Sequence, residues 1–463
     1  MKFANGADIK NISDIINAKS ESLGRKFLAY THVFGCAQNT ADMENIRGML
    51  KYMGYGFCDE AKYADIIVIN TCAVREGAEC RIYGNVGQFK KLKEQNPELI
   101  VCVCGCMMQQ PKVVEKLKKS YPYVDVIFGT HNIDRFPTLV LNKMSTGKRT
   151  VEILEKGEIV EGMPSERDFG ASCNVSIMYG CDNFCSYCIV PYTRGREKSR
   201  KPQDVLSEIK SLVSSGYSEI NLLGQNVNSY GKGLDEKITF AQLLKQVNDI
   251  PGVRRIRFMT SHPKDLSDEL IETMAACSKV CKSLHLPFQA GCTRVLEKMN
   301  RRYTKEQYIE LALKIKKRIP GIALTTDVIV GFPGETNEEF EHTLDVLKKV
   351  RFDGVFSFIY SRREGTAAAK MEDVISEEEK HANLERLLKL QQDINFEINC
   401  SYIGGEYEVL VDGVSKTRNS LLTGHTDTNK IVHFEGSENL IGTYKRVKIT
   451  EAKSFYLKGE LCE

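Results

Sequence analysis

The sequence predicts an α/β protein with three structured parts: an N-terminal parallel-sheet domain, a central partial (β/α)6 barrel and a small C-terminal β-barrel. Three observations predict this class. Strand-like apolar runs alternate with helical stretches from residue 27 to about 140, and six further strand-like runs alternate with helices between residues 167 and 396. The last part of the chain has short strand patterns with glycine turns. A length of 463 residues leaves room for about three domains.

The N-terminal sheet domain is expected over residues 27–145. Residues 1–26 are polar, and we expect them to form a frayed extension. The strands of the domain are expected at residues 26–34, 64–71, 98–105 and 125–129. Helical stretches separate these runs, as in βαβ units of a parallel sheet.

The central domain is expected over residues 167–396, after a polar linker at 146–166. Its strands are expected at residues 174–180, 219–224, 255–260, 282–287, 322–331 and 354–361. Six strands rather than eight predict a partial barrel, and chemistry in such barrels lies at the C-terminal ends of the strands. A long amphipathic helix from residue 376 leads into the C-terminal barrel, residues 397–463.

The composition is that of an ordinary soluble globular protein. Hydrophobic residues make up 42% and charged residues 27%, and the net charge of +3 is small, so a nucleic-acid partner would be bound by local basic patches. Neither a signal peptide nor a run of eighteen apolar residues is evident, which predicts a cytoplasmic protein without a membrane partner. Sixteen cysteines in such a chain favour metal or cluster binding over disulfides.

Cys181, Cys185 and Cys188 form a C-x-x-x-C-x-x-C run after the first strand of the central domain. Three thiolates on one loop can hold three corners of a cubane iron-sulfur cluster and leave the fourth iron open to a ligand. Buried structural thiols or a zinc site are the alternatives. Structural zinc requires four ligands, and no C-x-x-C or histidine pair lies nearby to complete the set.

Three more cysteines, Cys36, Cys72 and Cys106, each follow a predicted strand of the N-terminal domain. Parallel strands present their C-terminal ends at one edge of the sheet, so these thiols could share one metal site. Cys102 and Cys104 lie within a strand and are expected in the core. The pattern alone leaves a shared site and buried structural thiols equally open.

The central run resembles the signature of the radical-SAM superfamily, including the aromatic Tyr187 before the last cysteine. In that superfamily the open iron binds S-adenosylmethionine, which the reduced cluster cleaves. Gly224 with Gln225, and Asp327 to Gly331, resemble the segments that flank this cofactor, although a single glycine at a strand end is more often an ordinary turn.

The motifs GCAQNTADME, NTCAVREGAE and GCMMQQ, with MYGCDNFCSYCIVPYTRGREKSR, resemble those of the radical-SAM methylthiotransferase family. The resemblance implies a second 4Fe-4S cluster on Cys36, Cys72 and Cys106, and a C-terminal barrel similar to the RNA-binding TRAM domain. NTCAVRE, VPYTRGRE and QNVNSYG are closest to the MiaB branch. Membership would imply conversion of N6-isopentenyladenosine at position 37 of tRNA to its 2-methylthio derivative, with two S-adenosylmethionine molecules and two 4Fe-4S clusters.

Two sister branches remain alternatives: one modifies threonylcarbamoyl-adenosine in tRNA and the other an aspartate of a ribosomal protein. The segment IYSRREGTAAAK departs from the commoner Pro-containing version of the family. Implied partners are a tRNA anticodon stem-loop and an electron donor such as flavodoxin or ferredoxin, and the chain is expected to be a monomer. A non-enzymatic RNA-binding metalloprotein is the alternative from another class. No side chain is assigned as a catalytic acid or base, and His285 is expected to be structural.

Basic residues close to the cysteines suggest RNA contacts. The candidates are Arg194, Arg196, Lys198 and Arg200, then Arg301 and Arg302, and in the C-terminal barrel Lys416, Arg418 and Lys430. From Cys400 onward the chain has eight basic and nine acidic residues, so this part would have to bind RNA with one face. The lysine-rich stretch at 314–318 is expected to be a solvated helix face.

Overall fold

The computed structural model describes residues 5–74, 76–167, 170–415 and 421–462, and the chain forms two compact units. Unit 1 comprises Met1–Asp168, Tyr179–Asp182 and Ile189–Lys198. Unit 2 comprises Phe169–Met178, Asn183–Cys188 and Ser199–Glu463. Each unit has its own hydrophobic core, and each is described separately below.

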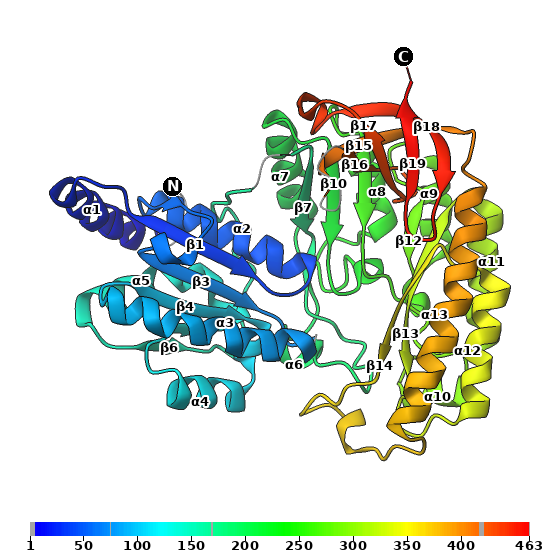
Figure 1. Ribbon diagram of the computed structural model, residues 1–463, viewed down its shortest axis with the longest axis horizontal. Helices are drawn as coiled ribbons and strands as arrows, with labels where there is room; N and C mark the ends of the chain where they lie inside the picture. The colour runs from blue at the N-terminus through cyan, green and yellow to red at the C-terminus, as the bar shows by residue number, and fades with distance from the viewer. Residues whose placement is uncertain (1–4, 75, 168–169, 416–420, 463) are drawn as a thin grey trace. The chain divides into compact units, whose positions relative to one another are not determined.

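Unit 1 contains a six-stranded parallel sheet in the order β2-β1-β3-β4-β5-β6 (Figure 1). The strands are β1 (Leu28–Val33), β2 (Gly56–Phe57), β3 (Ile66–Thr71), β4 (Ile100–Gly105), β5 (Val126–Phe128) and β6 (Thr150–Glu152). Its helices are α1 (Gly6–Leu23), α2 (Ala37–Tyr52), α3 (Glu76–Gln95), α4 (Pro111–Ser120), α5 (Phe136–Thr146) and the short α6 (Val190–Thr193). The four strands predicted in this domain are confirmed.

Helices cover both faces of this sheet. Successive side chains of β3 and β4 point to opposite faces, and both sets of side chains are largely apolar. Val68 and Cys102 pack in a cluster with residues of α1, α2 and α5, whereas Ile67 and Val101 pack in a second cluster with residues of α3 and α4. Such double burial explains the continuous apolar runs of these strands. Cys102 and Cys104 belong to the first cluster, as predicted.

Two sequence predictions for unit 1 need correction. Residues 6–23 are not a frayed extension but helix α1, whose Ile9, Ile12 and Ile16 are buried against the sheet. The three isoleucines recur at helical spacing, so a mostly polar segment still has one apolar face. The expected linker at 146–166 contains β6, which pairs with β5 and extends the sheet.

Unit 2 contains the six predicted central strands, arranged as two three-stranded parallel sheets in the orders β11-β10-β7 and β12-β13-β14. A parallel bridge between Ile256 of β11 and Val280 continues the pairing toward β12. The strands are β7 (Ser172–Ser176), β10 (Glu219–Leu223), β11 (Arg255–Phe258), β12 (Ser283–His285), β13 (Ala323–Val330) and β14 (Gly354–Ile359). Two short strands, β8 (Met178–Tyr179) and β9 (Lys198–Ser199), pair with each other.

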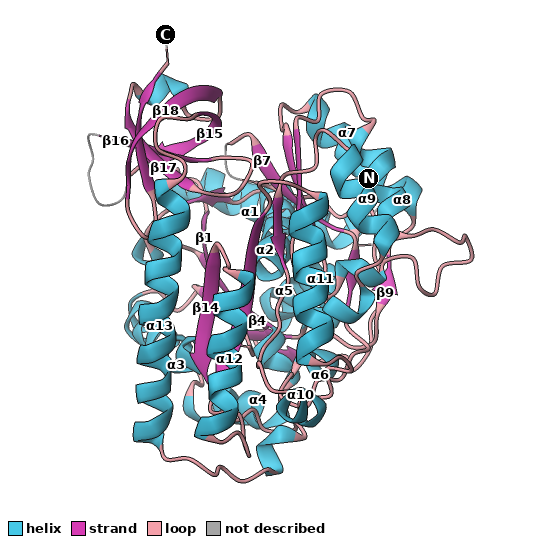
Figure 2. Cartoon of the chain, turned by 90° about the vertical axis from the view of Figure 1, so that its right-hand side faces the viewer, coloured by secondary structure: helices cyan, strands magenta, loops and turns pink. Residues whose placement is uncertain are grey.

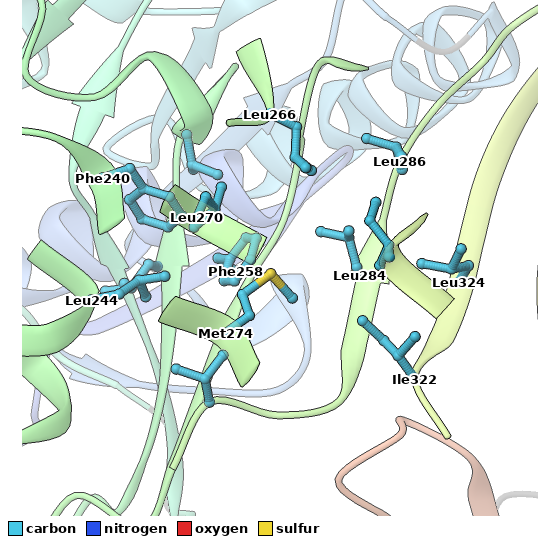
Figure 3. Packing of buried hydrophobic residues seen from close by; sticks show 14 of the residues in the cluster. Phe240, Leu244, Phe258, Leu266, Leu270, Met274, Leu284, Leu286, Ile322 and Leu324 are labelled. Atoms are coloured by element: carbon cyan, nitrogen blue, oxygen red, sulfur yellow. The ribbon is translucent and has the colours of Figure 1, made fainter. Parts of the chain in front are cut away.

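Helices cover the outer faces of these strands and form the largest apolar core (Figure 3). They are α7 (Pro202–Ser214), α8 (Phe240–Asn248), α9 (Asp268–Ala276), α10 (Thr293–Lys298), α11 (Lys305–Arg318), α12 (Asn337–Val350) and α13 (Glu377–Cys400). Figure 2 shows α11, α12 and α13 side by side. Thr304, Thr336 and Ser376 begin these three helices, and each forms a capping box with the Gln or Glu three positions later.

The C-terminal part of unit 2 is a closed five-stranded barrel in the order β15-β16-β17-β19-β18. Its strands are β15 (Glu406–Val414), β16 (Leu421–His425), β17 (Ile431–Glu435), β18 (Tyr444–Ala452) and β19 (Leu457–Leu461). A single apolar cluster, which includes Val409, Val432 and Phe434, fills the interior. The predicted small β-barrel is confirmed. No helix among the described residues is long and apolar enough to cross a membrane.

A buried ionic network joins this barrel to the N-terminal ends of β10 and β11. Glu219 of β10 accepts a hydrogen bond from Arg257 Nε at 3.0 Å, and its Oε1 lies 3.0 Å from His425 Nε2 of β16. Arg257 donates to the carbonyl of Thr426 at 2.6 Å, and Arg255 donates to that of Glu408 at 2.6 Å. The barrel is thereby fixed to the ends of the strands opposite those at which barrel enzymes carry out chemistry.

Candidate functional site

The strands β1, β3 and β4 are neighbours in unit 1, and a candidate cysteine follows each of them. Gly35 and Gly105 directly precede Cys36 and Cys106 and have positive φ angles of 139° and 100°. A Cβ atom at Gly35 would lie 2.7 Å from the Cβ atom of Cys72, so only glycine permits this approach. The three strand ends therefore bring Cys36, Cys72 and Cys106 into one region of unit 1.

The amide of Asn39, one turn into α2, connects these strand ends. Asn39 Nδ2 donates to Asn70 Oδ1 and to the carbonyl of Thr71, both at 2.8 Å. Its Oδ1 accepts a hydrogen bond from Cys36 Sγ at 3.2 Å and lies 4.0 Å from Cys106 Sγ. Asn39 is fully buried, so it fixes the positions of the cysteines with little freedom.

A buried ion pair lies beside the three thiols. Arg194 Nη2 donates to Asp42 Oδ2 at 2.8 Å and to Asn39 Oδ1 at 3.4 Å. Burial raises the pKa of the Cys106 thiol to about 12, Arg194 opposes this rise, and Cys36 adds to it. A protein-bound metal centre would supply the positive charge that thiolate ligands require.

The arrangement fits a cluster better than a single metal ion. Within the described ranges, no three His, Cys, Asp or Glu side chains are placed as ligands of one metal ion. Three cysteines without a fourth protein ligand match a cubane with one open iron. Cys36 is exposed while Cys72 and Cys106 are buried, so one side of the trio is accessible from solvent.

The second cysteine run is divided between the units, with Cys181 in unit 1 and Cys185 and Cys188 in unit 2. In unit 1, the backbone N–H of Cys181 donates to the carbonyl of Gly195 at 3.2 Å. In unit 2, Asn300 Nδ2 donates to the carbonyl of Phe184 at 3.0 Å. Neighbouring segments therefore hold the backbone of the run in place.

Arg301 is a buried side chain that contacts the run directly. Its Nη1 donates to Cys185 Sγ at 3.6 Å, its Nη2 to the carbonyl of Pro287 at 2.5 Å, and its Nε to Tyr303 Oη at 2.9 Å. The expectation that Arg301 contacts RNA is wrong, because its guanidinium is enclosed by these partners. No sequence pattern separates such an arginine from its neighbour Arg302.

Polar side chains on the loops after β10 and β11 have the properties of a ligand site that the sequence analysis missed. Asn226, Asn228, Ser261 and His262 each have a buried N or O atom without a hydrogen-bond partner among the described residues. Burial, followed by the charge of Arg301, lowers the pKa of His262 to about 2, so its imidazole is neutral. Buried polar atoms normally have partners, so these four atoms indicate a polar ligand at the C-terminal ends of the strands.

The residues expected to flank the cofactor lie at or near the C-terminal ends of β10 and β13. A Cβ atom at Gly224 would lie 2.5 Å from Met178 Cγ, and one at Gly331 would lie 2.4 Å from Lys380 Cγ, so protein packing alone requires both glycines. Gln225 follows Gly224 and is half-buried. Asp327 Oδ2 lies 3.3 Å from His285 Nε2. Cofactor contacts of these residues, and of Tyr187, stay predictions.

The structure corrects part of the predicted RNA-contact set. Arg194 and Arg200 are both buried. Arg200 Nη1 donates to Glu208 Oε2 and to the carbonyl of Ser176, both at 2.7 Å. Neither guanidinium is therefore available to a phosphate. Arg196 has 69% of its side chain exposed and its Nε lies 3.0 Å from Asp182 Oδ1, and Lys198 Nζ lies 2.9 Å from Glu158 Oε1.

The remaining basic candidates lie in the C-terminal barrel and on α11. Lys430 is buried against Asp353 at 2.9 Å, so it does not face RNA. Lys416 and Arg418 lie outside the described residues. The basic stretch of α11 is ion-paired with α9, through Lys314 with Asp268 and Arg318 with Glu272, in line with the solvated-face interpretation.

Comparisons with known proteins agree with this arrangement. Three family models match: the uncharacterized protein family UPF0004 over residues 28–129, the Radical SAM superfamily over 175–347 and the TRAM domain over 401–462. A solved structure of the radical S-adenosylmethionine methyltransferase TsrM from Kitasatospora setae, with cobalamin and a [4Fe-4S] cluster bound, is similar with a TM-score of 0.54 and 14% identity. The similarity covers 74% of each chain, and at this identity it concerns the fold alone.

Curated relatives are much more similar in sequence. A protein of Thermoanaerobacter sp. (strain X514) is 53% identical over 96% of this chain and 94% of its own length. A protein of Acetivibrio thermocellus is 52% identical over 98% and 95%, and one of Clostridioides difficile is 52% identical over 95% and 92%. All three are named tRNA-2-methylthio-N(6)-dimethylallyladenosine synthase. At this identity over nearly the whole chain, the protein belongs to the radical-SAM family of tRNA-2-methylthio-N(6)-dimethylallyladenosine synthases.

Proposed function

We propose that this chain is a tRNA methylthiotransferase that converts N6-dimethylallyladenosine, also called N6-isopentenyladenosine, to its 2-methylthio derivative. The observation that carries the proposal is the identity of 52–53% with relatives of that name over at least 95% of the chain. The Radical SAM, UPF0004 and TRAM matches cover the central, N-terminal and C-terminal parts in the order found in the fold.

The cysteines would hold two 4Fe-4S clusters. Cys181, Cys185 and Cys188 would hold the cluster that binds S-adenosylmethionine, and Cys36, Cys72 and Cys106 the second one. The first cluster with its S-adenosylmethionine supplies the radical chemistry that an inert aromatic C–H bond requires, and the second supplies or carries the sulfur.

The chain's own residues bind and orient these groups. Arg301 holds Cys185 through a guanidinium–sulfur contact, and Asn39 fixes Cys36 by a hydrogen bond. The buried polar atoms of Ser261 and His262 are suited to polar groups of S-adenosylmethionine, and His262 Nε2 can donate a proton in a hydrogen bond because its Nδ1 accepts from the backbone N–H of Lys264.

The TRAM match supports an RNA partner, and the substrate would be the tRNA anticodon stem-loop. In keeping with the sequence analysis, we further propose a cytoplasmic monomer that receives electrons from a donor such as flavodoxin or ferredoxin. Arg196, Lys198 and Arg302 remain the described residues proposed to contact phosphates.

Mass spectrometry of tRNA nucleosides from a deletion strain tests the substrate. Loss of 2-methylthio-N6-isopentenyladenosine with accumulation of the unmethylthiolated nucleoside is expected, and re-expression of the chain restores the product. Loss of the methylthio derivative of threonylcarbamoyl-adenosine instead would assign the chain to the sister activity. Unchanged tRNA would contradict the RNA assignment.

Iron content tests the ligand sets. Anaerobic reconstitution should give about eight irons per chain, and a variant with Cys36, Cys72 and Cys106 changed to alanine should retain about four. That variant should still cleave S-adenosylmethionine. Cys58, Cys277 and Cys400 are half-buried cysteines outside both trios, and changing all three to alanine should leave about eight irons. Full iron content in the first variant would contradict the assignment.

A further inference from the structure

Two aromatic side chains of β14 remain uncovered in unit 2. Phe356 is 55% exposed and Phe358 is 54% exposed, and both point to the same face because they are two residues apart on a strand. On the opposite face, Val355 packs into the core beneath the helices. Figure 2 shows β14 beside α12 and α13. An uncovered pair of phenyl rings on a sheet face indicates a binding surface.

The neighbouring strands complete this face. In the parallel register, Asp327 of β13 pairs with Phe356 and Ile329 pairs with Phe358. His285 of β12 bonds to Thr325 Oγ1 at 3.0 Å, and its ring lies 5.8 Å from that of Phe356 at 70°. The face thus has an apolar end at Phe358 and Ile329, and a polar end at Asp327 and His285.

The apolar end of the face leads to the loop that carries Cys185 and Cys188. The backbone N–H of Ala368, in the segment after β14, donates to the carbonyl of Ser186 at 2.8 Å. Tyr187 packs with Phe332 and Tyr360, which follow β13 and β14 directly. The uncovered face is therefore continuous, within unit 2, with the candidate radical-SAM loop.

The substrate of the proposed function matches the chemistry of this face. Dimethylallyladenosine combines a flat aromatic base with a branched, uncharged five-carbon group. Phenyl rings stack on bases, and phenyl and isoleucine side chains accept an alkenyl group. A threonylcarbamoyl substituent would instead place a carboxylate against the apolar side chains of Phe358 and Ile329, which cannot compensate for its lost hydration. We infer that Phe356 and Phe358, with Ile329, bind the dimethylallyl-bearing base and select for the prenyl group, an inference that rests on the proposed function.

Binding of anticodon stem-loop RNA tests the inference independently of turnover. Three oligonucleotides are compared on the full, anaerobically reconstituted chain, with dimethylallyladenosine, adenosine or threonylcarbamoyl-adenosine at the target position. The wild-type chain should bind the prenylated RNA most tightly. The double variant Phe356→Ala with Phe358→Ala should bind the prenylated RNA about tenfold to a hundredfold more weakly. Its affinity for the adenosine RNA should fall much less, because that RNA loses only the stacking of its base and no contact with a prenyl group.

Matched controls separate this effect from a folding defect. Phe396 of α13 is 47% exposed on a helix, and Phe396→Ala should bind all three RNAs as the wild type does. The rate of S-adenosylmethionine cleavage without RNA should be the same in the wild type, the Phe396→Ala control and the double variant, because none of these substitutions changes a cluster ligand.

Two outcomes would overturn the inference. In the first, the double variant keeps the preference for prenylated RNA. In the second, its affinity for prenylated and adenosine RNA falls equally, which would make the face a general RNA contact or a site for another partner. If the wild type forms the 2-methylthio product in either case, the proposed function stands. If the wild type forms no product, the function itself fails, whatever the phenylalanine variants do.

Discussion

The Asp42–Arg194 pair lies in the interior of unit 1 beside the first cysteine trio. Both side chains are almost fully buried, and the guanidinium has Asp42 and the amide oxygen of Asn39 as partners. A buried charge is tolerated only when its partners compensate for lost hydration. The pair therefore fixes the segment that contains Arg194 against α2, close to the residue that bonds Cys36.

Replacing Asp42 by Asn removes the compensating charge at nearly constant volume. We expect a loss of about 3–5 kcal/mol in the free energy of unfolding, because Arg194 keeps its charge without a carboxylate. Urea unfolding followed by circular dichroism measures this change. Glu166→Gln is the control, since Glu166 pairs with Lys51 at the surface of the same unit and should contribute less than about 1 kcal/mol. Equal effects of the two substitutions would argue against the buried-pair interpretation.

The convergence of Cys36, Cys72 and Cys106 was one of two possibilities that the sequence left open, and it follows from a topology that brings the ends of β1, β3 and β4 together. The partners Asn39, Arg194 and Arg301 could not be predicted. An arginine in a basic run has the same local sequence whether it faces solvent or a buried sulfur, and only tertiary packing distinguishes the two cases. His262, whose buried Nε2 lacks a hydrogen-bond partner among the described residues, was missed for the same reason.

At the scale of elements, the ionic network that joins β16 to the N-terminal ends of β10 and β11 lowers the pKa of one of its groups and raises the pKa of another. Burial raises the pKa of Glu219, but the hydrogen bond from His425 and the charge of Arg257 outweigh it and lower the value to about 2. Burial lowers the pKa of His425, but Asp412 and Glu219 outweigh it and raise the value above 6.5. The charged forms of both groups are thus stabilised by folding.

Stability should follow these shifts with a definite sign. The contribution of Glu219 is complete above about pH 4.5 and is lost as pH falls toward 2. That of His425 is complete below about pH 6.5 and is lost as pH rises through its raised pKa. His425→Gln should therefore reduce the urea midpoint most near pH 5.5 and progressively less toward about pH 9.

The exposed His381 of α13 provides the control for this experiment. His381→Gln should give only a small difference, because this imidazole is at the surface and bonds only to the carbonyl of Glu377 among the described residues. A pH-independent difference for His425→Gln would contradict the proposed role of the ion pair.

Helices and strands whose sequence contains a long apolar run could be predicted, and elements that lack such a run could not. All six central strands were predicted, because each has a run of apolar or β-branched residues bounded by turns. The strands β2 and β6 contain two and three residues, none of them buried, so they have no buried apolar run. Helix α1 was hidden by its polar composition, although Ile9, Ile12 and Ile16 mark one face.

At the scale of the whole molecule, charge is nearly balanced, with 64 Lys and Arg against 61 Asp and Glu. Most of the arginine and lysine side chains named above form ion pairs with carboxylates of the same chain. RNA affinity must then depend on a few exposed cations, and it should be sensitive to salt through those residues.

Arg196→Ala should weaken binding of anticodon stem-loop RNA equally for prenylated and unmodified RNA. It should also reduce the slope of log affinity against log salt by about one. Fluorescence anisotropy at several salt concentrations measures both effects. Arg318→Ala is the control: Arg318 has 53% of its side chain exposed and pairs with Glu272, as Arg196 pairs with Asp182, but it lies on α11 outside the proposed RNA contact, and its loss should leave the slope unchanged. A slope unaffected by Arg196→Ala would remove this residue from the RNA contact.

The attachment of the C-terminal barrel to β10 and β11 limits how freely this part of the chain can be exchanged. A truncated chain that ends at residue 400 would leave Glu219, Arg255 and Arg257 without their barrel partners at the edge of the central sheet. Transplanting the barrel onto another enzyme would require the recipient to offer the same acid and arginines. The five-stranded barrel is therefore a structural part of the domain that carries β10 and β11, bound to it by buried charged side chains.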